Sequence, residues 1–527
     1  MHLPRLGLLG LLLAAAAVPA ASAATFRWAN NGDVTAMDPD TLQETVQLSF
    51  LSNIYEPLVQ RNAELKLEPA LAVKWEQVSP TDWRFHLRPG VKFQDGTPFT
   101  SADVVFSAER LLNKASAMRN VLGMIKEVKA DGPLTVDFIT KRPDPIFPQE
   151  QTNLLIMSKA WCEKHDATAP AVLGAGDNYA IHHAMGTGPY KLVSREPDRK
   201  TVVEYNKLWW GKLKGNATKV EFDVIKNDST RVAALLSGQV DMIYTVPPQD
   251  MARIAHAPGL RIIEHPELRT IYLAFDVSRP ELPSSNVKGK NPFQDVRVRK
   301  AFALAIDEDL IAKRVMLGMA HPTWLMWGKG VNGYDPKLDV RPKTNVAEAK
   351  KLLAEAGYPK GFTVGFDCPN DRYVMDEQIC TAITSMLGRI GVKVNLDAQT
   401  KAKFFAKILA PKYDTDFYLL GWTPATYDAE NVLYTLLGTR DGVRGEVNAG
   451  GYSNPKLDAL IEKIGTETNE AKRDAMIDDA ARIIQQDVPV IPLHQQVIVW
   501  AARKGVSVVQ PADNNFPYRY IDVKTAH

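Results

Sequence analysis

The sequence predicts an α/β fold in which helices are laid over β-sheets. Helix and strand patterns alternate to the end of the chain, and no fixed-period repeat or low-complexity tract interrupts them. In the stretch RVAALLSGQVDMIY, a helical pattern stops near Gly238 and an alternating strand pattern follows through Val240, Met242 and Tyr244. Hydrophobic residues make up 45% of the chain and charged residues 24%, as is typical of globular proteins.

Other elements carry recognisable start signals. The stretch WRFHLRPGVKFQDGTPFT predicts two strands around the turn at Pro89-Gly90. Thr100 and Asp103 then form a capping-box pattern at the start of a helix. Later helices are expected to begin after the caps Asp295 and Asn345, and with Pro455 at the first helical position.

The length of the chain predicts more than one domain, and its net charge argues against a nucleic-acid partner. A chain of 527 residues is too long for one ordinary core, so two or more domains are expected. There are 63 Lys and Arg residues against 61 Asp and Glu residues, a formal charge of +2. Nucleic-acid-binding proteins usually carry a clear basic excess, so no nucleic-acid partner is expected.

The first 23 residues have the pattern of a secretory signal peptide. A short basic start leads into an apolar stretch, Leu6 to Val18, and then into the small-residue site Ala21-Ser22-Ala23. Cleavage after Ala23 would leave 527 − 23 = 504 residues. This remainder has no apolar segment long enough to span a bilayer, so an exported, soluble protein is expected.

The chain has three cysteines, Cys162, Cys368 and Cys380. A disulfide is permitted in an oxidising compartment, and Cys368 with Cys380 is the expected pair because the loop between them is short. The alternative is three buried free thiols. No CxxC spacing is present, so a zinc or thioredoxin-type site is not indicated.

Several stretches, in this order, resemble the bacterial family 5 extracellular solute-binding proteins, which are the peptide, nickel and opine receptors of ABC importers. The longest matching stretch is LEPALAVKWEQVSPTDWRFHLRPGVKFQDGTPFTSADVVFSAERLL at residues 67–112. The others include IYEPLVQ at 54–60, GTGPYKL at 186–192, NPFQDVRVRKAFALAID at 291–307, the GW loop at 421 and GYSNPKLDALIEK at 451–463. The resemblance covers nearly all of the chain after the signal peptide.

The resemblance implies a type II periplasmic binding fold, with two α/β lobes that close over a ligand about a hinge. On this sequence, lobe I would comprise residues 24–268 and 497–527, with an extra subdomain at about 61–180. Lobe II would comprise residues 269–496.

The resemblance also implies a function. The protein would be a periplasmic receptor, expected as a monomer, that delivers its ligand to an ABC permease and ATPase complex. It would be a binding protein with no cofactor, not an enzyme. A short peptide is the default ligand, and an opine or another non-peptide carboxylate is the alternative.

The loop GWTPATYDAEN departs from the peptide-binding pattern. In peptide-binding relatives, an Asp three residues after the Trp holds the ammonium group of the ligand, but here that position is Ala425. Asp428 stands three residues further on, about 10 Å along an extended chain. A buried ammonium needs a counter-charge. Either Asp428 or another acid such as Asp33 takes this role, or the ligand has no amine there.

The predicted ligand-binding set is Trp422, Thr423, Tyr427, Asp428, Asp33, Met37 and Arg372. Trp422 would form a wall of the cleft, and its alternative is a packing aromatic between the lobes. Asp428 would otherwise cap the next helix. Arg372 suits a ligand carboxylate because a guanidinium binds it bidentately, and the alternative is a surface role. For Asp33 and Met37 the alternative is a turn stabilised by an Asx side chain.

Metal binding and catalysis have weak support. Adjacent residues His182 and His183 would point to opposite faces of a strand, which makes a poor chelate, so no metal is expected. An exported hydrolase would need a site such as GxSxG or HExxH, and both motifs are absent. A periplasmic chaperone or sensor with the same fold is a further alternative.

Overall fold

The structure is a computed structural model that describes residues 24–42, 44–172, 177–370, 372–409, 412–442 and 444–524. The predicted signal peptide, residues 1–23, lies outside the described residues.

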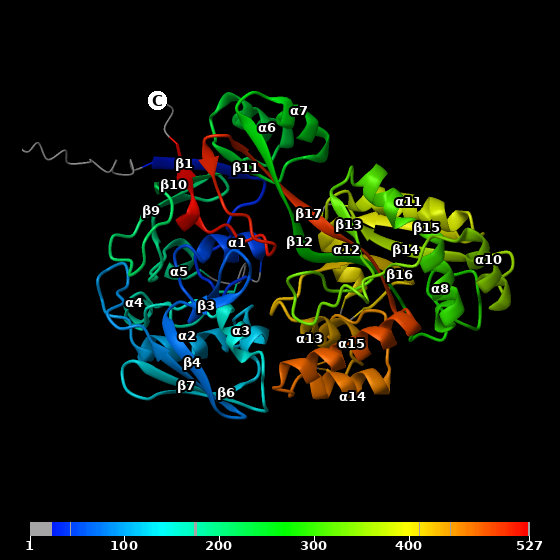
Figure 1. The fold of residues 1–527 in the computed structure, drawn as a ribbon, viewed down its shortest axis with the longest axis horizontal. Helices are drawn as coiled ribbons and strands as arrows, with labels where there is room; N and C mark the ends of the chain where they lie inside the picture. Colours follow the sequence, from blue (N-terminus) through cyan, green and yellow to red (C-terminus); the bar gives the residue numbers. More distant parts are fainter. Residues whose placement is uncertain are drawn as a thin grey trace, which may run out of the picture.

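One mixed 11-stranded sheet runs through the molecule (Figure 1). Ten of its strands follow one another in the order β15 (Lys393–Gln399), β14 (Thr363–Pro369), β16 (Phe417–Trp422), β12 (Leu260–Phe275), β17 (Val490–Arg503), β11 (Met242–Tyr244), β1 (Ala24–Asn30), β10 (Ala217–Val224), β9 (Lys200–Tyr205) and β8 (Tyr190–Glu196). The eleventh strand, β13 (Ala320–Pro322), pairs with β17.

The long strands β12 and β17 connect the two lobes of the fold. They pair antiparallel from Leu260↔Arg503 to Ala274↔Val490, with irregular register after Pro266. One end of this ribbon pairs with β11 and the other with β16, and Figure 1 shows it crossing between the two halves. The proposed lobe boundaries, at 268/269 and 496/497, fall inside these strands, so the hinge would be a two-stranded ribbon.

Each half of the molecule has hydrophobic cores of its own. Phe26, Trp28 and Trp500 belong to a core on the β1 side of the sheet, whereas Phe293, Phe366 and Phe417 belong to a core on the β16 side. Separate cores are what a fold of two lobes requires, because each lobe must bury its own apolar faces.

A smaller sheet forms the centre of a subdomain in the N-terminal part of the chain. Its strand order is β4 (Ala72–Ser79), β5 (Asp82–Leu87), β7 (Thr135–Thr140) and β6 (Ile125–Ala130). It has its own core with α2 (Ser101–Leu111) and α3 (Phe147–Glu150), and β2 (Val59–Arg61) pairs with β3 (Leu67–Pro69) beside it. Of the two strands predicted around the Pro89-Gly90 turn, the first is confirmed as β5 and the second is wrong, since β5 pairs with β4 and β7, and residues 91–99 form a loop that contains a Lys92–Pro98 bridge.

The predicted helix signals are confirmed. Thr100 and Asp103 form the capping box of α2. Gly238 ends α6 (Asp228–Ser237) in the left-handed conformation at a φ of 79°. Asp295 caps α8 (Val296–Ala305), Asn345 caps α10 (Val346–Glu355), and Pro455 begins α14 (Pro455–Ile464).

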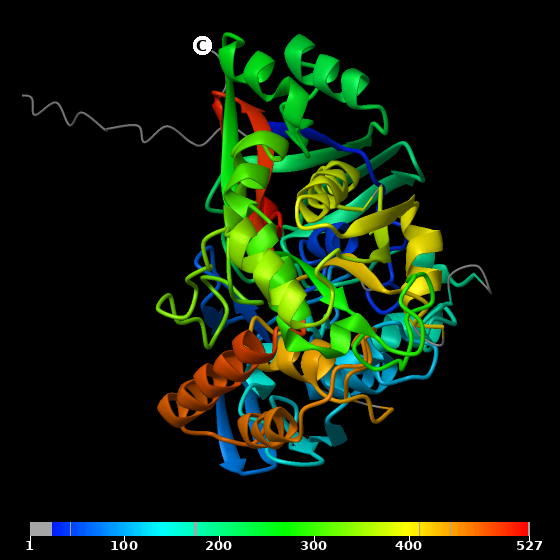
Figure 2. The same cartoon turned by 90° about the vertical axis from the view of Figure 1, so that its right-hand side faces the viewer.

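The other helices complete the lobes. They are α1 (Thr45–Leu51), α4 (Lys159–Lys164), α5 (Tyr179–His182), α7 (Met251–His256), α9 (Glu308–Leu310), α11 (Asp376–Gly388), α12 (Lys401–Ile408), α13 (Ala429–Val432) and α15 (Glu470–Asp487). A two-stranded sheet, β18 (Val506–Ser507) and β19 (Asp522–Val523), lies near the C-terminus. Figures 1 and 2 both place α14 and α15 beside the subdomain. None of the helices among the described residues is long and apolar enough to span a bilayer.

Candidate ligand-binding site

The GW loop begins where β16 meets β12, at the junction of the two lobes. Trp422 pairs with Thr270 across this junction. A Cβ atom on Gly421 would lie 2.7 Å from Tyr373 Cε1 and from Ile271 Cδ1, so a larger residue here would displace these side chains. The loop leaves the strand here and leads into α13.

Asp428, at the end of this loop, is fully buried. Its side chain accepts a hydrogen bond from the Glu430 backbone N–H and caps α13. Both of its oxygens also accept hydrogen bonds from Arg473, at 2.7 and 2.6 Å. This geometry favours the helix-cap alternative for Asp428 over a role as ammonium anchor.

Trp422 and Thr423 are half-buried. The Trp422 Nε1 donates a hydrogen bond to Asn431 Oδ1 at 2.9 Å, which fixes the indole against its own loop. The Thr423 Oγ1 is buried and has no hydrogen-bond partner among the residues that the structure describes. Asn431 also accepts a hydrogen bond from the Ala425 N–H, so the loop is internally braced.

Tyr427 joins the loop to the other lobe. Its hydroxyl donates to Asp513 Oδ2 at 3.0 Å, and the Arg61 guanidinium lies 4.1 Å from its ring centroid. Arg61 Nη2 also donates to the Thr426 carbonyl at 3.0 Å. The backbone of Tyr427 has a φ of 57°, and its carbonyl accepts a hydrogen bond from Asn332 N–H at 2.8 Å. Together these contacts connect residues 423–428 to both the subdomain and the C-terminal segment.

A cavity of about 130 Å³, partly open to solvent and lined by both polar and apolar groups, lies next to this junction. Its walls come from residues 52–63, 152–155 and 511–520, from Pro189, and from Tyr427 on the opposite lobe. Of the predicted binding residues that the structure describes, Tyr427 is the one that lines it.

Two acids that line the cavity, Glu56 and Asp513, have hydrogen-bond partners and raised pKa values. Glu56 accepts hydrogen bonds from Thr187, Trp209 and Trp210, and burial raises its pKa. Burial also raises the pKa of Asp513, which accepts from Tyr427 and Asn515.

Arg61 is different from these acids. Burial lowers its pKa, and its guanidinium has no carboxylate oxygen within 4.0 Å among the described residues. The described partners of Arg61 are the carbonyl oxygens of Leu65 and Thr426 and the amide of Gln149. The charges of Asp513 and Asp428 also act on Arg61, but all of its direct hydrogen bonds go to neutral acceptors, which leaves room for an anion as an additional partner.

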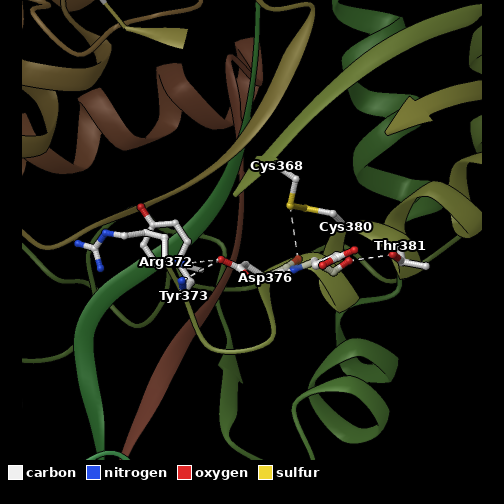
Figure 3. The surroundings of a disulfide bond; sticks show 7 residues. Cys368, Arg372, Tyr373, Asp376, Cys380 and Thr381 are labelled. Carbon is white, nitrogen blue, oxygen red and sulfur yellow. Dashed lines mark hydrogen bonds between the residues drawn. A yellow bond between two sulfur atoms is a disulfide. The ribbon is translucent and has the colours of Figure 1, made fainter. Parts of the chain in front are cut away.

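Arg372 lies on a loop that a disulfide holds in place (Figure 3). Cys368 at the end of β14 is bonded to Cys380 in α11, the pair expected from the sequence, and Cys162 is free and buried. The backbone N–H groups of Arg372 and Tyr373 both donate to Asp376 Oδ2 at 2.9 Å. The Arg372 side chain is exposed and extends away from the disulfide.

Glu267 interacts electrostatically with charged groups from both sides of the junction. Glu267 of β12 is buried and forms an ion pair with Arg269 at 3.1 Å. Burial raises the pKa of Glu267, while the charges of Arg269 and Arg372 lower it and that of Asp513 raises it. Arg372 and Asp513, from opposite lobes, are therefore both within electrostatic reach of Glu267.

Asp33 and Met37 lie in lobe I and are occupied by other contacts. Asp33 accepts hydrogen bonds from the backbone N–H groups of Val34 and Asp198 at 2.7 Å and from Arg195 at 3.2 Å. Met37 is fully buried in the core. These positions favour the turn alternative for Asp33 and a packing role for Met37.

The histidine pair is also placed differently from the expectation. His182 is the last residue of α5, and its Nε2 lies 3.0 Å from Asp177. In the part of the chain that the structure describes, no group of three or more His, Cys, Asp or Glu side chains is arranged to hold a metal ion.

Sequence reasoning missed Arg61, Asp513 and Glu267. Arg61 directly follows the stretch IYEPLVQ at the end of the short strand Val59–Arg61, and the sequence carries no signal of its contact with Tyr427. Asp513 stands in the turn sequence PADNN, which gives no indication of the distant partner Tyr427.

Comparisons with known proteins agree with this architecture. The chain is 27% identical over 511 residues to the probable deoxycholate-binding periplasmic protein YgiS of Escherichia coli, covering 91% of this chain and 90% of the relative. It is 26% identical over 514 residues to the glutathione-binding protein GsiB of Pectobacterium atrosepticum, covering 94% of each. The solved structure of AgaA from A. tumefaciens R10 in complex with agropinic acid matches with a TM-score of 0.77 and 26% identity, over 96% of this chain and 99% of that one.

A family model gives the assignment directly. The model for bacterial extracellular solute-binding proteins, family 5 Middle, matches residues 66–443, which is more than half of the chain. This span includes most of the subdomain, parts of both proposed lobes and the GW loop. The chain therefore belongs to the family 5 bacterial extracellular solute-binding proteins, a family of ligand receptors.

Proposed function

We propose that this protein is a periplasmic receptor that captures a small carboxylate-bearing molecule between its lobes and delivers it to an ABC permease and ATPase complex. A short peptide is the first candidate, and an opine or another non-peptide carboxylate is the second. The observation that carries the proposal is the cavity next to the lobe junction, where Tyr427 of one lobe meets Arg61 and Asp513 of the other.

The position of the cavity suits this role. Its walls come from both sides of the lobe junction, with Tyr427 on one side and Arg61 and Asp513 on the other. Capture and release need no catalytic group, so we infer that the protein is not an enzyme. The signal-peptide pattern supports export to the periplasm, where we propose that the receptor works as a monomer.

The charges favour a carboxylate over an ammonium group. Ala425 lacks the acid of peptide-binding relatives, and the Asp428 carboxylate is held by Arg473. Arg61, by contrast, lacks an ion-pair partner among the described residues, and Arg372 is exposed on the facing loop. Guanidinium groups bind carboxylates bidentately. Deoxycholate, glutathione and agropinic acid, named for the relatives, all carry a carboxylate.

Native mass spectrometry of the purified mature protein, with identification of whatever co-purifies, tests the proposal. We expect a compound that carries a carboxylate. A short peptide would support the first candidate, and an opine or another non-peptide carboxylate would support the second. The affinity for that compound is then measured in Arg61→Gln and in Arg372→Gln, with Arg482→Gln as the control because Arg482 is exposed on α15. A neutral or cationic ligand, or unchanged affinity in both test variants, would reject the carboxylate assignment.

Trp422 offers a second readout. If the indole lines the closed cleft, the co-purifying compound should change its fluorescence, and Trp422→Ala should bind more weakly. A Trp422→Ala protein that binds as tightly as the parent would limit Trp422 to packing against its own loop.

A further inference from the structure

A group of buried carboxyls lies where the subdomain meets lobe II. Asp144 and Glu150 come from the subdomain, just before and at the end of α3, and Glu430 comes from α13 of lobe II. Asp144 is 5% exposed and Glu150 is 9% exposed. Glu430 is half-buried and interacts electrostatically with both. The group therefore spans a contact that exists only while the subdomain and lobe II are together.

Some oxygens of these buried carboxyls have no hydrogen-bond partner among the described residues. One oxygen of Asp144 accepts a hydrogen bond from the Ile146 N–H at 3.1 Å. Its other oxygen, and one oxygen of Glu150, are buried without a hydrogen-bond partner among the described residues. An ionised carboxylate in such a place loses its hydration and gains little in return, whereas the protonated form is tolerated.

The nearby positive charges are already shared with other acids. Arg473 is held bidentately by Asp428, within lobe II. Arg142 of the subdomain forms an ion pair with Glu462 of α14 at 2.9 Å, and its guanidinium lies 5.9 Å from the Tyr434 ring.

The carboxyls at this contact outnumber the nearby guanidiniums. The four carboxyls Asp144, Glu150, Glu430 and Asp428 face two guanidiniums, so 4 − 2 = 2 negative charges are left over even before Glu462 is included.

We propose that Asp144, Glu150 and Glu430 form a proton-operated latch, which takes up protons when the subdomain and lobe II come together and which opens as they are lost. The latch sets the balance between open and closed lobes in the protein without added ligand. It depends on the lobe closure of the proposed function, but not on the identity of the ligand.

The direction of the pKa shifts agrees with this. Burial, followed by the charge of Asp428, raises the pKa of Glu430 to about 7, although Arg473 and Arg142 lower it. Burial also raises the pKa of Asp144 and that of Glu150. In the open form these groups would return towards the ordinary range near pH 4.

The sign of the pH dependence follows from these shifts. Because the closed form holds the protons more tightly, closure becomes more favourable as the pH falls from about 7 towards 4 to 5. Above this window Glu430 and Asp144 are ionised in both forms, and the closed form is disfavoured.

Single-molecule FRET measures the balance directly. Fluorophores are attached at Lys126→Cys in the subdomain and Lys456→Cys in lobe II, both at exposed positions. Cys162 is buried and the other two cysteines are bonded to each other, so the labels go to the introduced thiols. Between pH 8 and pH 5.5, the closed-to-open ratio should rise by up to about tenfold per pH unit for each proton taken up.

The test variant is Glu150→Gln/Glu430→Gln, which resembles the protonated latch. It should be more closed than the parent at pH 8 and should respond less to pH. Glu163→Gln, at an exposed acid of the same subdomain, is the matched control and should follow the parent. If the double variant does not fold, Glu430→Gln alone, at a half-buried position, replaces it.

Two results would overturn the latch: a closed-to-open ratio in the parent that does not change with pH, or the same pH profile in the parent and the variant. Neither result bears on which compound co-purifies, so failure of the latch and failure of the proposed ligand class are distinguishable.

Discussion

Asp428 and Arg473 form a buried, bidentate ion pair, with hydrogen bonds of 2.7 and 2.6 Å, between the end of the GW loop and α15. The side chain of Asp428 is fully buried and that of Arg473 is 6% exposed. Because the same carboxylate also caps α13, it holds the loop, the short helix and the long helix together. Its role is structural, and it fixes the position of Tyr427 next to the cavity.

We expect Asp428→Ala to lower the free energy of unfolding by about 3–5 kcal/mol, since it removes both carboxylate oxygens that hydrogen-bond the buried Arg473 guanidinium. Denaturant titration measures this. Asp479→Ala is the control, because Asp479 and Arg482 form an exposed pair worth about 0–1 kcal/mol. A folded Asp428→Ala protein with parental stability and lost ligand binding would instead restore Asp428 as a ligand anchor.

Tyr427→Phe should weaken ligand binding about 10- to 100-fold, measured by calorimetry with the co-purifying compound. The change removes a hydrogen bond to the buried Asp513 that forms across the lobes, worth about 1.5–3 kcal/mol. Tyr452→Phe is the matched control, because its bond to Asp487, at 2.6 Å, lies within lobe II. It should reduce stability without a specific loss of affinity, so equal affinity losses in both variants would contradict the cross-lobe role.

Loss of the disulfide should destabilise lobe II. Cys368 and Cys380 are 12 residues apart, and closing a loop of this length is worth about 3 kcal/mol. We expect the Cys368→Ser/Cys380→Ser protein to have a lower midpoint in thermal unfolding. Reductant should lower the midpoint of the parent towards that of the variant and leave the variant unchanged. A parent whose midpoint is the same with and without reductant would show that the bond contributes no stability.

Local features of the fold could be predicted from the sequence, but distant pairings could not. The caps Thr100, Asp295 and Asn345 were recognisable because a cap acts within four residues of its own position. The second strand predicted after Pro89-Gly90 is absent because both edges of β5 are already paired, with β4 directly before it and with β7 about 50 residues later. The two-lobe fold came from the family resemblance, since composition and periodicity define only the α/β class.

The candidate site was less predictable for the same reason. Asp428 is neutralised by Arg473, which is 45 residues away in the chain, and Tyr427 meets Asp513, which is 86 residues away. Neither partner is marked by a motif. The GW loop was found because it follows an apolar strand, but which of its side chains face the cavity depends on its three-dimensional path.

Gly421→Ala should weaken ligand binding through the packing behind the GW loop. The added Cβ would lie 2.7 Å from Tyr373 and Ile271 and 3.0 Å from Arg269, so these side chains must move. Overpacking of this kind costs about 1–3 kcal/mol, and it shifts the loop that carries Arg372. Gly388→Ala, where a Cβ meets nothing within 4 Å at the end of α11, is the control and should keep or slightly raise stability. Thermal unfolding and calorimetry measure both variants. Parental stability and affinity in Gly421→Ala would show that this junction tolerates a side chain and that its packing does not position the site.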